Sequence, residues 1–296
     1  MENLNKLQAL ILRPIQPDGH NKDSLLSQIT LEGAVSHHYP VMKITPLASL
    51  FKGDLISRHL LNISMYDRVI FISRAAVFYV FDWLKRNAID YSGGLATGPR
   101  YYAIGKSTAT ALKLCSVNAE FPNREFSSEG LLALPSLQRP SDEKILIFSG
   151  VGGRKLLSDQ LYNRGATVNQ CELYCRSASQ DFSKEINTLI YSDQLDVIII
   201  HSGELLDNLV SQVSGEGLYK LMRLPLLVPS QRIALLANKM GFKNIVCSPS
   251  AAAEDMISRL VSSKSQDHFL AAAQALDRIL TAGRYVIPIH TNTVSR

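Results

Sequence analysis

A glycine-rich segment, Gly150–Arg154 (GVGGR), is the strongest chemical motif of this sequence. It follows the apolar run Lys144–Phe148 and precedes a stretch with helical periodicity. Glycines at such a strand-to-helix turn let backbone N–H groups approach an anion near the helix N-terminus. A tight turn that needs positive φ would explain the same residues. The motif favours an anion-binding turn made by Gly150, Gly152, Gly153 and Arg154, with a purely conformational role as the alternative.

Two nucleotide-binding patterns are approached in this sequence but not completed. A dinucleotide fingerprint needs another glycine at the position of Lys155. A phosphate loop before the GKS of Gly105–Ser107 needs a glycine at the position of Arg100. We therefore expect no nucleotide cofactor.

Serine follows three other apolar runs. Ser73 ends VIFIS, Ser202 ends VIIIHS and Ser230 ends LLVPS. Each could cap the next helix, a contribution of about 1 kcal/mol. The carboxyl ends of strands are also where open α/β sheets bind ligands. Capping and ligand contact both stay open for these serines.

The histidines and cysteines do not form a recognisable metal or hydrolase site. The adjacent His37 and His38 would point to opposite faces of a strand. Cys171 and Cys175 have no second pair of ligands nearby. His201 precedes a serine, but no GxSxG elbow accompanies it. We expect no metal, and free thiols in a reducing compartment.

Length and charge narrow the class of protein further. A chain of 296 residues exceeds one ordinary domain. The net charge of +5 favours an anionic partner, but the absence of Lys/Arg runs argues against nucleic acid. The sequence has neither a signal-peptide pattern at its start nor an apolar stretch of about 18 residues, so we expect a cytoplasmic protein without a membrane span.

Short apolar runs alternate with helical stretches along the chain. Continuous Ile/Val/Leu runs are typical of parallel strands buried on both faces, and the alternation predicts an α/β protein with doubly wound parallel sheets. The predicted strands are 7–12, 68–72, 101–104, 144–148, 197–200, 224–228 and 244–246. The predicted helices are 23–31, 75–86, 108–114, 154–163, 183–191, 204–213, 232–240 and 252–262.

The strands fall into two series, which predicts two lobes. Strands near 68, 101, 120 and 144 form one series, and strands near 8, 197, 225 and 244 form the other. The more polar segments His37–Ile44 and Thr167–Tyr174 flank the middle series and are interpreted as a two-stranded connector. Lobe 1 is then discontinuous (1–36 and 176–263), lobe 2 is inserted (37–175), and 264–296 form a helical extension of unassigned role.

In their order and spacing, seven segments resemble the uroporphyrinogen-III synthase family. One departure is Ala75, where the family often has Asn. The resemblance covers residues 8 to about 262 and leaves the extension outside. The segments are Ile11–Pro14, Phe71–Val77, Ala103–Leu112, Ser127–Leu132, Gly150–Arg176, His201–Leu209 and Ser230–Phe242.

This resemblance implies two lobes with the substrate in the cleft between them. It implies a lyase that dehydrates hydroxymethylbilane and closes it, through a spiro intermediate, to uroporphyrinogen III with ring D inverted. Tyr174, which ends the second connector segment, is the implied catalytic acid, with hinge packing as its alternative role. Carboxylate-binding residues in the matched motifs are Arg13, Ser73, Thr108, Gly150, Gly152, Gly153, Arg154, Ser202, Ser230 and Arg232.

The expected partner is the polycarboxylate substrate, which hydroxymethylbilane synthase could hand over, and the expected state is a monomer without cofactor. Another class of protein stays open: a two-lobed regulatory protein that binds a small anion without catalysis. Such a protein also pairs doubly wound sheets, but it usually carries an export signal or a DNA-binding module. Turnover of the substrate distinguishes the two.

Overall fold

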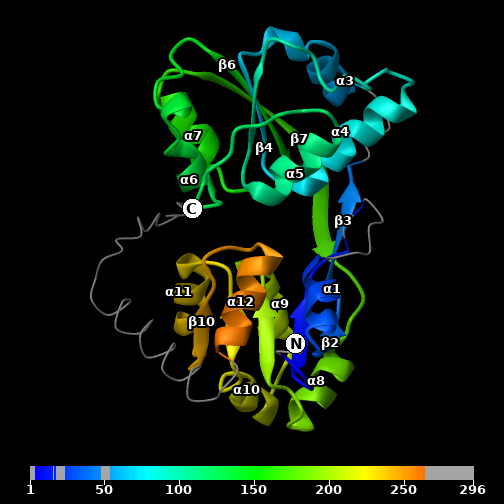
Figure 1. Cartoon of the computed structure of the whole chain (residues 1–296), viewed down its shortest axis with the longest axis vertical. Coiled ribbons are helices and arrows are strands. Elements are labelled where there is room, and N and C mark those ends of the chain that lie inside the picture. The colour runs from blue at the N-terminus through cyan, green and yellow to red at the C-terminus, as the bar shows by residue number, and fades with distance from the viewer. Residues whose placement is uncertain (1–3, 16, 18–23, 48–53, 264–296) are drawn as a thin grey trace, which may run out of the picture.

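The structure is a computed structural model that describes residues 4–15, 17, 24–47 and 54–263 (Figure 1). Two lobes, each built on a five-stranded sheet, are joined by two strands. In this described part, no helix is both long and apolar enough to cross a bilayer. The predicted extension at 264–296 lies outside the described residues.

Lobe 1 takes its strands from both parts of the chain that flank lobe 2. Its sheet has the order β10-β9-β8-β1-β2, and every pair is parallel. Alternate residues of β1 and β8 enter two separate hydrophobic clusters, one on each face. Helices α1 and α12 cover one face, and α8, α9, α10 and α11 cover the other. The strands are β1 (Gln8–Leu12), β2 (Val35–His38), β8 (Val197–Ile200), β9 (Leu226–Val228) and β10 (Ile245–Cys247). The helices are α1 (Ser24–Leu31), α8 (Ser183–Tyr191), α9 (Gly203–Gln212), α10 (Glu216–Leu221), α11 (Gln231–Met240) and α12 (Ala253–Ser262).

Lobe 2 has the sheet order β3-β7-β6-β4-β5, parallel except for the pair of β3 and β7. Helices α3, α4 and α5 cover one face, and α6 and α7 cover the other. The strands are β3 (Met42–Pro46), β4 (Arg68–Phe71), β5 (Arg100–Ala103), β6 (Lys144–Gly150) and β7 (Thr167–Ala178). The helices are α3 (Asp54–Leu61), α4 (Arg74–Arg86), α5 (Lys106–Leu114), α6 (Ser128–Leu132) and α7 (Leu156–Asn163), with 3₁₀ turns η1 (Ile63–Met65) and η2 (Pro135–Leu137).

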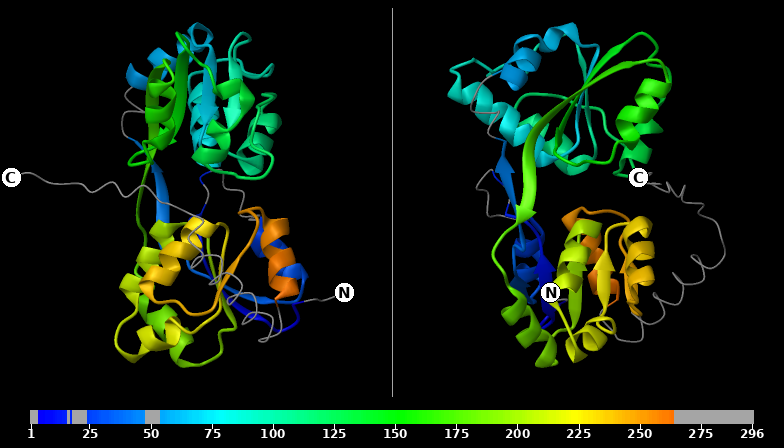
Figure 2. Two further views of the ribbon diagram at one scale, coloured as in Figure 1. Left: turned by 90° about the vertical axis from the view of Figure 1, so that its left-hand side faces the viewer. Right: turned by 180° about the vertical axis from the view of Figure 1, so that it is seen from behind.

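The connector consists of β3 and β7, which pair antiparallel from Met42 and Ala178 to Pro46 and Tyr174. Figure 2 shows β7 as the long strand that leaves the sheet of lobe 2 toward lobe 1. The fold class, two doubly wound lobes with a two-stranded connector and a discontinuous first lobe, is therefore confirmed.

Three details of the predicted elements are wrong. The segment His37–Ile44 is not one strand, because Pro40 lacks an N–H group and separates β2, in lobe 1, from β3. The strand expected near 120 is a single bridge between Tyr102 and Glu120. The helix expected from Arg154 begins at Leu156. The predicted domain boundaries at 36/37 and 175/176 fall within β2 and β7, and they stay a prediction.

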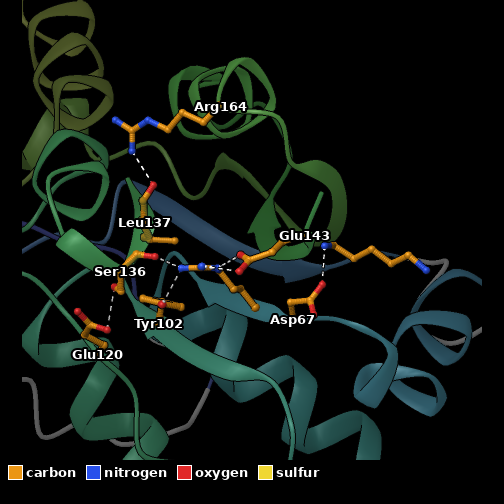
Figure 3. Close-up of polar contacts among 9 residues, drawn as sticks. Asp67, Tyr102, Glu120, Ser136, Leu137, Glu143 and Arg164 are labelled. Carbon is orange, nitrogen blue, oxygen red and sulfur yellow. Dashed lines mark hydrogen bonds and ion pairs between the residues drawn. The ribbon is translucent and has the colours of Figure 1, made fainter. Parts of the chain in front are cut away.

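A buried arginine ties the amino-terminal ends of the lobe 2 strands together. Arg68, at the start of β4, is only 5% exposed. Its Nη2 donates to Glu143 at 2.7 Å, its Nε also contacts Glu143, and its Nη1 donates to the Tyr102 hydroxyl at 3.1 Å and to the Ser136 carbonyl. Figure 3 shows these partners gathered from separate elements. Because its guanidinium group donates to several acceptors at once, Arg68 is a structural residue. It lies at the opposite end of β4 from Ser73.

Replacing Arg68 with Met should destabilise the protein by about 2 to 3 kcal/mol, because Glu143, Tyr102 and Ser136 all lose their donor in a largely buried position. Urea unfolding of the wild type and the Arg68→Met variant measures the change in the free energy of unfolding. Arg86→Met is the matched control: it breaks an exposed pair with Asp82 along α4 and should cost about 0.5 kcal/mol or less. Equal costs for both variants would contradict the structural role of Arg68.

Candidate active site

Both sheets reverse their strand order at one point, which marks where open α/β sheets bind ligands. In lobe 2 the reversal lies between β4 and β6, whose carboxyl ends lead to Ser73 and to Gly150. In lobe 1 it lies between β1 and β8, whose ends lead to Arg13 and to His201. Most of the predicted site residues therefore follow strands at or beside these two points.

The carboxyl-terminal edges of the two sheets face each other. Lys106, at the start of α5 after β5, forms an ion pair of 3.3 Å with Glu254 in the first turn of α12, after β10. Figure 1 shows α5 and α12 at the adjoining ends of the two lobes. We call these two edges, with the helix starts that follow them, the interlobe face. Sequence reasoning missed this contact because it joins residues far apart in the chain.

Tyr174 lies where β7 passes from one partner strand to the other. Its backbone is paired with Gly150 of β6 and with Pro46 of β3. Its hydroxyl is 2.9 Å from the Ser73 Oγ, and its ring stacks on Tyr79 with centroids 5.8 Å apart. Burial, followed by the charge of Asp82, raises the pKa of Tyr79 to about 12. Tyr174 is therefore a packed residue of the connector that also carries a positioned hydroxyl, and its role as the catalytic acid stays a prediction.

The glycines of the GVGGR segment are explained by different physical requirements. A Cβ on Gly150 would lie 2.6 Å from the Tyr174 Cζ, so the absence of a side chain makes room for the ring. Gly152 has a φ of +71°, a backbone conformation that residues with a side chain rarely adopt. A Cβ on Gly153 would meet nothing closer than 3.6 Å. The conformational explanation holds for Gly152, a close approach explains Gly150, and anion binding by the turn stays a prediction.

The three serines at strand ends all cap helices. Backbone N–H groups donate to the side chain of Ser73 from Ala76, to that of Ser202 from Leu205 and to that of Ser230 from Ile233, over 3.0 to 3.4 Å. The capping role is confirmed for each of them, and ligand contact stays a prediction. Each serine hydroxyl keeps one hydrogen to donate.

Arg154, which follows β6 in lobe 2, and Arg232, in the first turn of α11 in lobe 1, lie at the carboxyl-terminal edges of the two facing sheets. Arg154 donates to Glu129 through both Nη atoms, at 3.2 and 2.7 Å. Partial burial and then the positive charge of Arg154 lower the pKa of Arg232, and Glu129 acts in the opposite direction. Two predicted binding residues thus share one electrostatic environment, and Glu129, which follows the Ser127 cap, was missed although it lies within the matched segment SSEGLL.

The remaining predicted residues are Thr108, which is buried like Tyr174, and Arg13, which is half-buried. Thr108 is 4% exposed within the first turn of α5, because this helix begins two residues earlier than expected. The carbonyl of Arg13 accepts a hydrogen bond of 2.9 Å from His38 Nε2. Beside it, both ring nitrogens of His201 are inaccessible and have no partner among the described residues. Burial, with the charge of Arg13, lowers the pKa of His201 far below its usual value, so the ring is neutral.

The thiols have no sign of activation. All four cysteines are free, and burial raises the pKa of Cys171 to about 12 and that of Cys247 to about 11. Across the described ranges, no group of three or more His, Cys, Asp or Glu side chains could hold a metal ion. The chemistry that the interlobe face offers consists of hydroxyls, backbone donors and guanidinium groups.

The fold and this face define a two-lobed α/β protein that presents neutral donors and arginines from both lobes. The family model described as "Uroporphyrinogen-III synthase HemD" matches residues 23–258. Uroporphyrinogen-III synthase of Salmonella typhimurium is 32% identical over 247 residues, which cover 83% of this chain and 96% of that protein. The chain belongs to the uroporphyrinogen-III synthase family, and the resemblance found in the sequence is confirmed.

Solved structures agree with this fold. A mutant uroporphyrinogen III synthase from Thermus thermophilus superimposes with a TM-score of 0.55 at 15% identity, covering 93% of this chain and 99% of that one. The enzyme from Helicobacter pylori gives 0.54 at 14% identity, covering 87% and 99%. These likenesses support the architecture alone.

Replacing Gly150 with Ala should destabilise the protein by about 1 to 3 kcal/mol, because the new methyl group overlaps the Tyr174 ring and forces it to move. The displaced ring should also lose its hydrogen bond with Ser73. Urea unfolding and a crystal structure of the variant measure both effects. Gly153→Ala, where the methyl group meets only ordinary contacts, should cost less; the opposite ranking would rule out the proposed packing.

Proposed function

We propose that this chain catalyses the reaction of its family, the dehydration and closure of hydroxymethylbilane to uroporphyrinogen III in tetrapyrrole (haem) biosynthesis. The observation that carries the proposal is the family match along residues 23–258, which includes every candidate site residue except Arg13. The enzyme is then a hydro-lyase.

The chemistry of this substrate demands positioning more than reactive groups. The hydroxymethyl group leaves readily from an electron-rich pyrrole and generates an azafulvene cation. Unaided, this cation closes to the type I isomer. To form type III, the protein must hold the chain so that the substituted carbon of ring D attacks first and gives the spiro intermediate. Selective binding of that folded transition state accounts for catalysis by hydroxyls, backbone donors and guanidinium groups.

Tyr174 is the proposed acid that protonates the leaving hydroxyl. A tyrosine hydroxyl both donates and accepts, and so does the serine hydroxyl beside it. Ser73 Oγ already accepts from the Ala76 N–H, so its own hydrogen is available to Tyr174 at 2.9 Å. In that arrangement the Tyr174 proton is free for the leaving group. Ser73 thereby orients the acid.

The carboxylates of the substrate require donors, which both lobes would supply. Serine hydroxyls, backbone N–H groups at helix starts and arginines bind carboxylates without a full complement of cations. The net charge of +5 adds a long-range attraction. The proposed binding residues are Arg13, Ser73, Thr108, Gly150, Gly152, Gly153, Arg154, Ser202, Ser230 and Arg232.

We further propose that the enzyme acts as a monomer in the cytoplasm and receives its unstable substrate from hydroxymethylbilane synthase. Lobe 1 comprises 1–36 and 176–263, and lobe 2 comprises 37–175. We expect no cofactor, and a redox cofactor has no role in this reaction because the product differs from the substrate only by the loss of water.

The purified protein should convert hydroxymethylbilane to the type III isomer without added metal, nucleotide or other cofactor. Chromatographic separation of isomers I and III measures this, with spontaneous closure as the baseline. A protein that binds the anion without catalysis would leave the product type I at every protein concentration, and that result would refute the proposal.

Replacing Tyr174 with Phe should lower turnover by roughly 10- to 1000-fold, the scale for losing one positioned proton donor. Tyr79→Phe is the matched control: it removes the hydroxyl of the stacked neighbour, which donates to the Ile44 carbonyl at 3.3 Å, and should change turnover little. Circular dichroism checks that both variants fold. Equal turnover of the folded Tyr174→Phe protein and the wild type would remove Tyr174 from the mechanism.

A further inference from the structure

Three ion pairs near the interlobe face share one design. In each, a glutamate in the first turn of a helix holds a basic side chain from elsewhere in the fold. All six side chains are at least one-third exposed, so solvent screens each pair and another anion can replace its glutamate. The pairs are Glu129 with Arg154, Glu204 with Arg176, and Glu254 with Lys106.

The pair of Glu129 and Arg154 differs from the other two in geometry and in surroundings. It is bidentate, with both guanidinium nitrogens on separate carboxylate oxygens, which is also how an arginine holds a substrate carboxylate. A second guanidinium, that of Arg232, lies within electrostatic range from the other lobe. Glu129 thus pairs with Arg154 and also acts on the charge of Arg232.

Arg232 lies where a cation is disfavoured unless an anion accompanies it. It occupies the first turn of α11, directly after the Ser230 cap, and the positive end of a helix repels cations. The positive charge of Arg154 adds to this repulsion. Within the described part of the chain, Arg232 has no ion pair or side-chain hydrogen bond of its own. Two guanidinium groups against one carboxylate leave one positive charge uncompensated.

We propose that Arg154 and Arg232 form a seat for one substrate carboxylate shared by both lobes, and that Glu129 occupies the Arg154 side of this seat until the substrate displaces it. The inference rests on the proposed function, since it names the residues that grip the polycarboxylate. Exchange of one carboxylate for another conserves the bidentate contact with Arg154. The incoming carboxylate also reaches Arg232, which Glu129 leaves unpaired, and this added contact drives the exchange.

Glu129 is therefore a competitor of the substrate, and removing its charge should tighten binding. In anaerobic calorimetric titrations with uroporphyrinogen III at low salt, Glu129→Gln should bind about two- to fivefold more tightly than wild type, as expected for one exposed ion pair. Arg154→Gln should bind more weakly. Adding Glu129→Gln to Arg154→Gln should give no tightening, because the competition requires Arg154.

Asp82→Asn is the matched control, since it removes a carboxylate from another exposed arginine pair, that with Arg86 on α4, and should leave affinity unchanged. If Glu129→Gln does not fold, Arg232→Gln decides: it should weaken binding and reduce its salt dependence. Unchanged or weaker binding by a folded Glu129→Gln protein, or unchanged binding by Arg232→Gln, overturns the proposal. Type III formation by the wild type, assayed in parallel, separates this failure from failure of the synthase assignment.

Discussion

The contact between the Tyr174 ring and the α carbon of Gly150 fixes the connector to lobe 2. At this point β7 is paired on one side with β6 and on the other with β3, so the strand that leads toward lobe 1 is anchored by the same residue that carries the candidate acid. Any side chain at position 150 would separate them. The hydrogen bond between Tyr174 and Ser73 also joins the start of α4 to this point. The course of β7 and the position of the Tyr174 hydroxyl are thereby determined together.

The two ends of the lobe 2 sheet have opposite characters. At the amino-terminal end, Arg68 is buried and satisfied by Glu143, Tyr102 and Ser136, which come from separate elements. At the carboxyl-terminal end, Tyr174 and Thr108 are buried as well, but Arg154 is exposed and is held by the exposed carboxylate of Glu129. A rigid amino-terminal end holds the strands in register, so that the other end can present adaptable groups without losing the fold.

Such an arrangement suits a reaction whose difficulty is regiochemical. The leaving group needs little help, whereas the choice of the attacking carbon depends on holding a long, charged chain in one folded shape. Donors distributed over two lobes can contact several carboxylates at once, and exposed glutamates pair with Arg154 and Arg176. Catalysis of this kind leaves no compact catalytic motif.

The sequence by itself determined the alternation of strands and helices, the two sheets, the serine caps and the family, because apolar periodicity, strand-end serines and motif order are local or sequential properties. It did not predict the division of 37–44 at Pro40, since an extended pattern does not tell which sheet a strand joins. Only the tertiary structure shows that Gly150 must be a glycine, because the Tyr174 ring lies against it. Only the tertiary structure pairs Glu129 with Arg154 and places their charges where they act on Arg232. These relations join residues that lie far apart in the chain, where sequence spacing carries no information about distance.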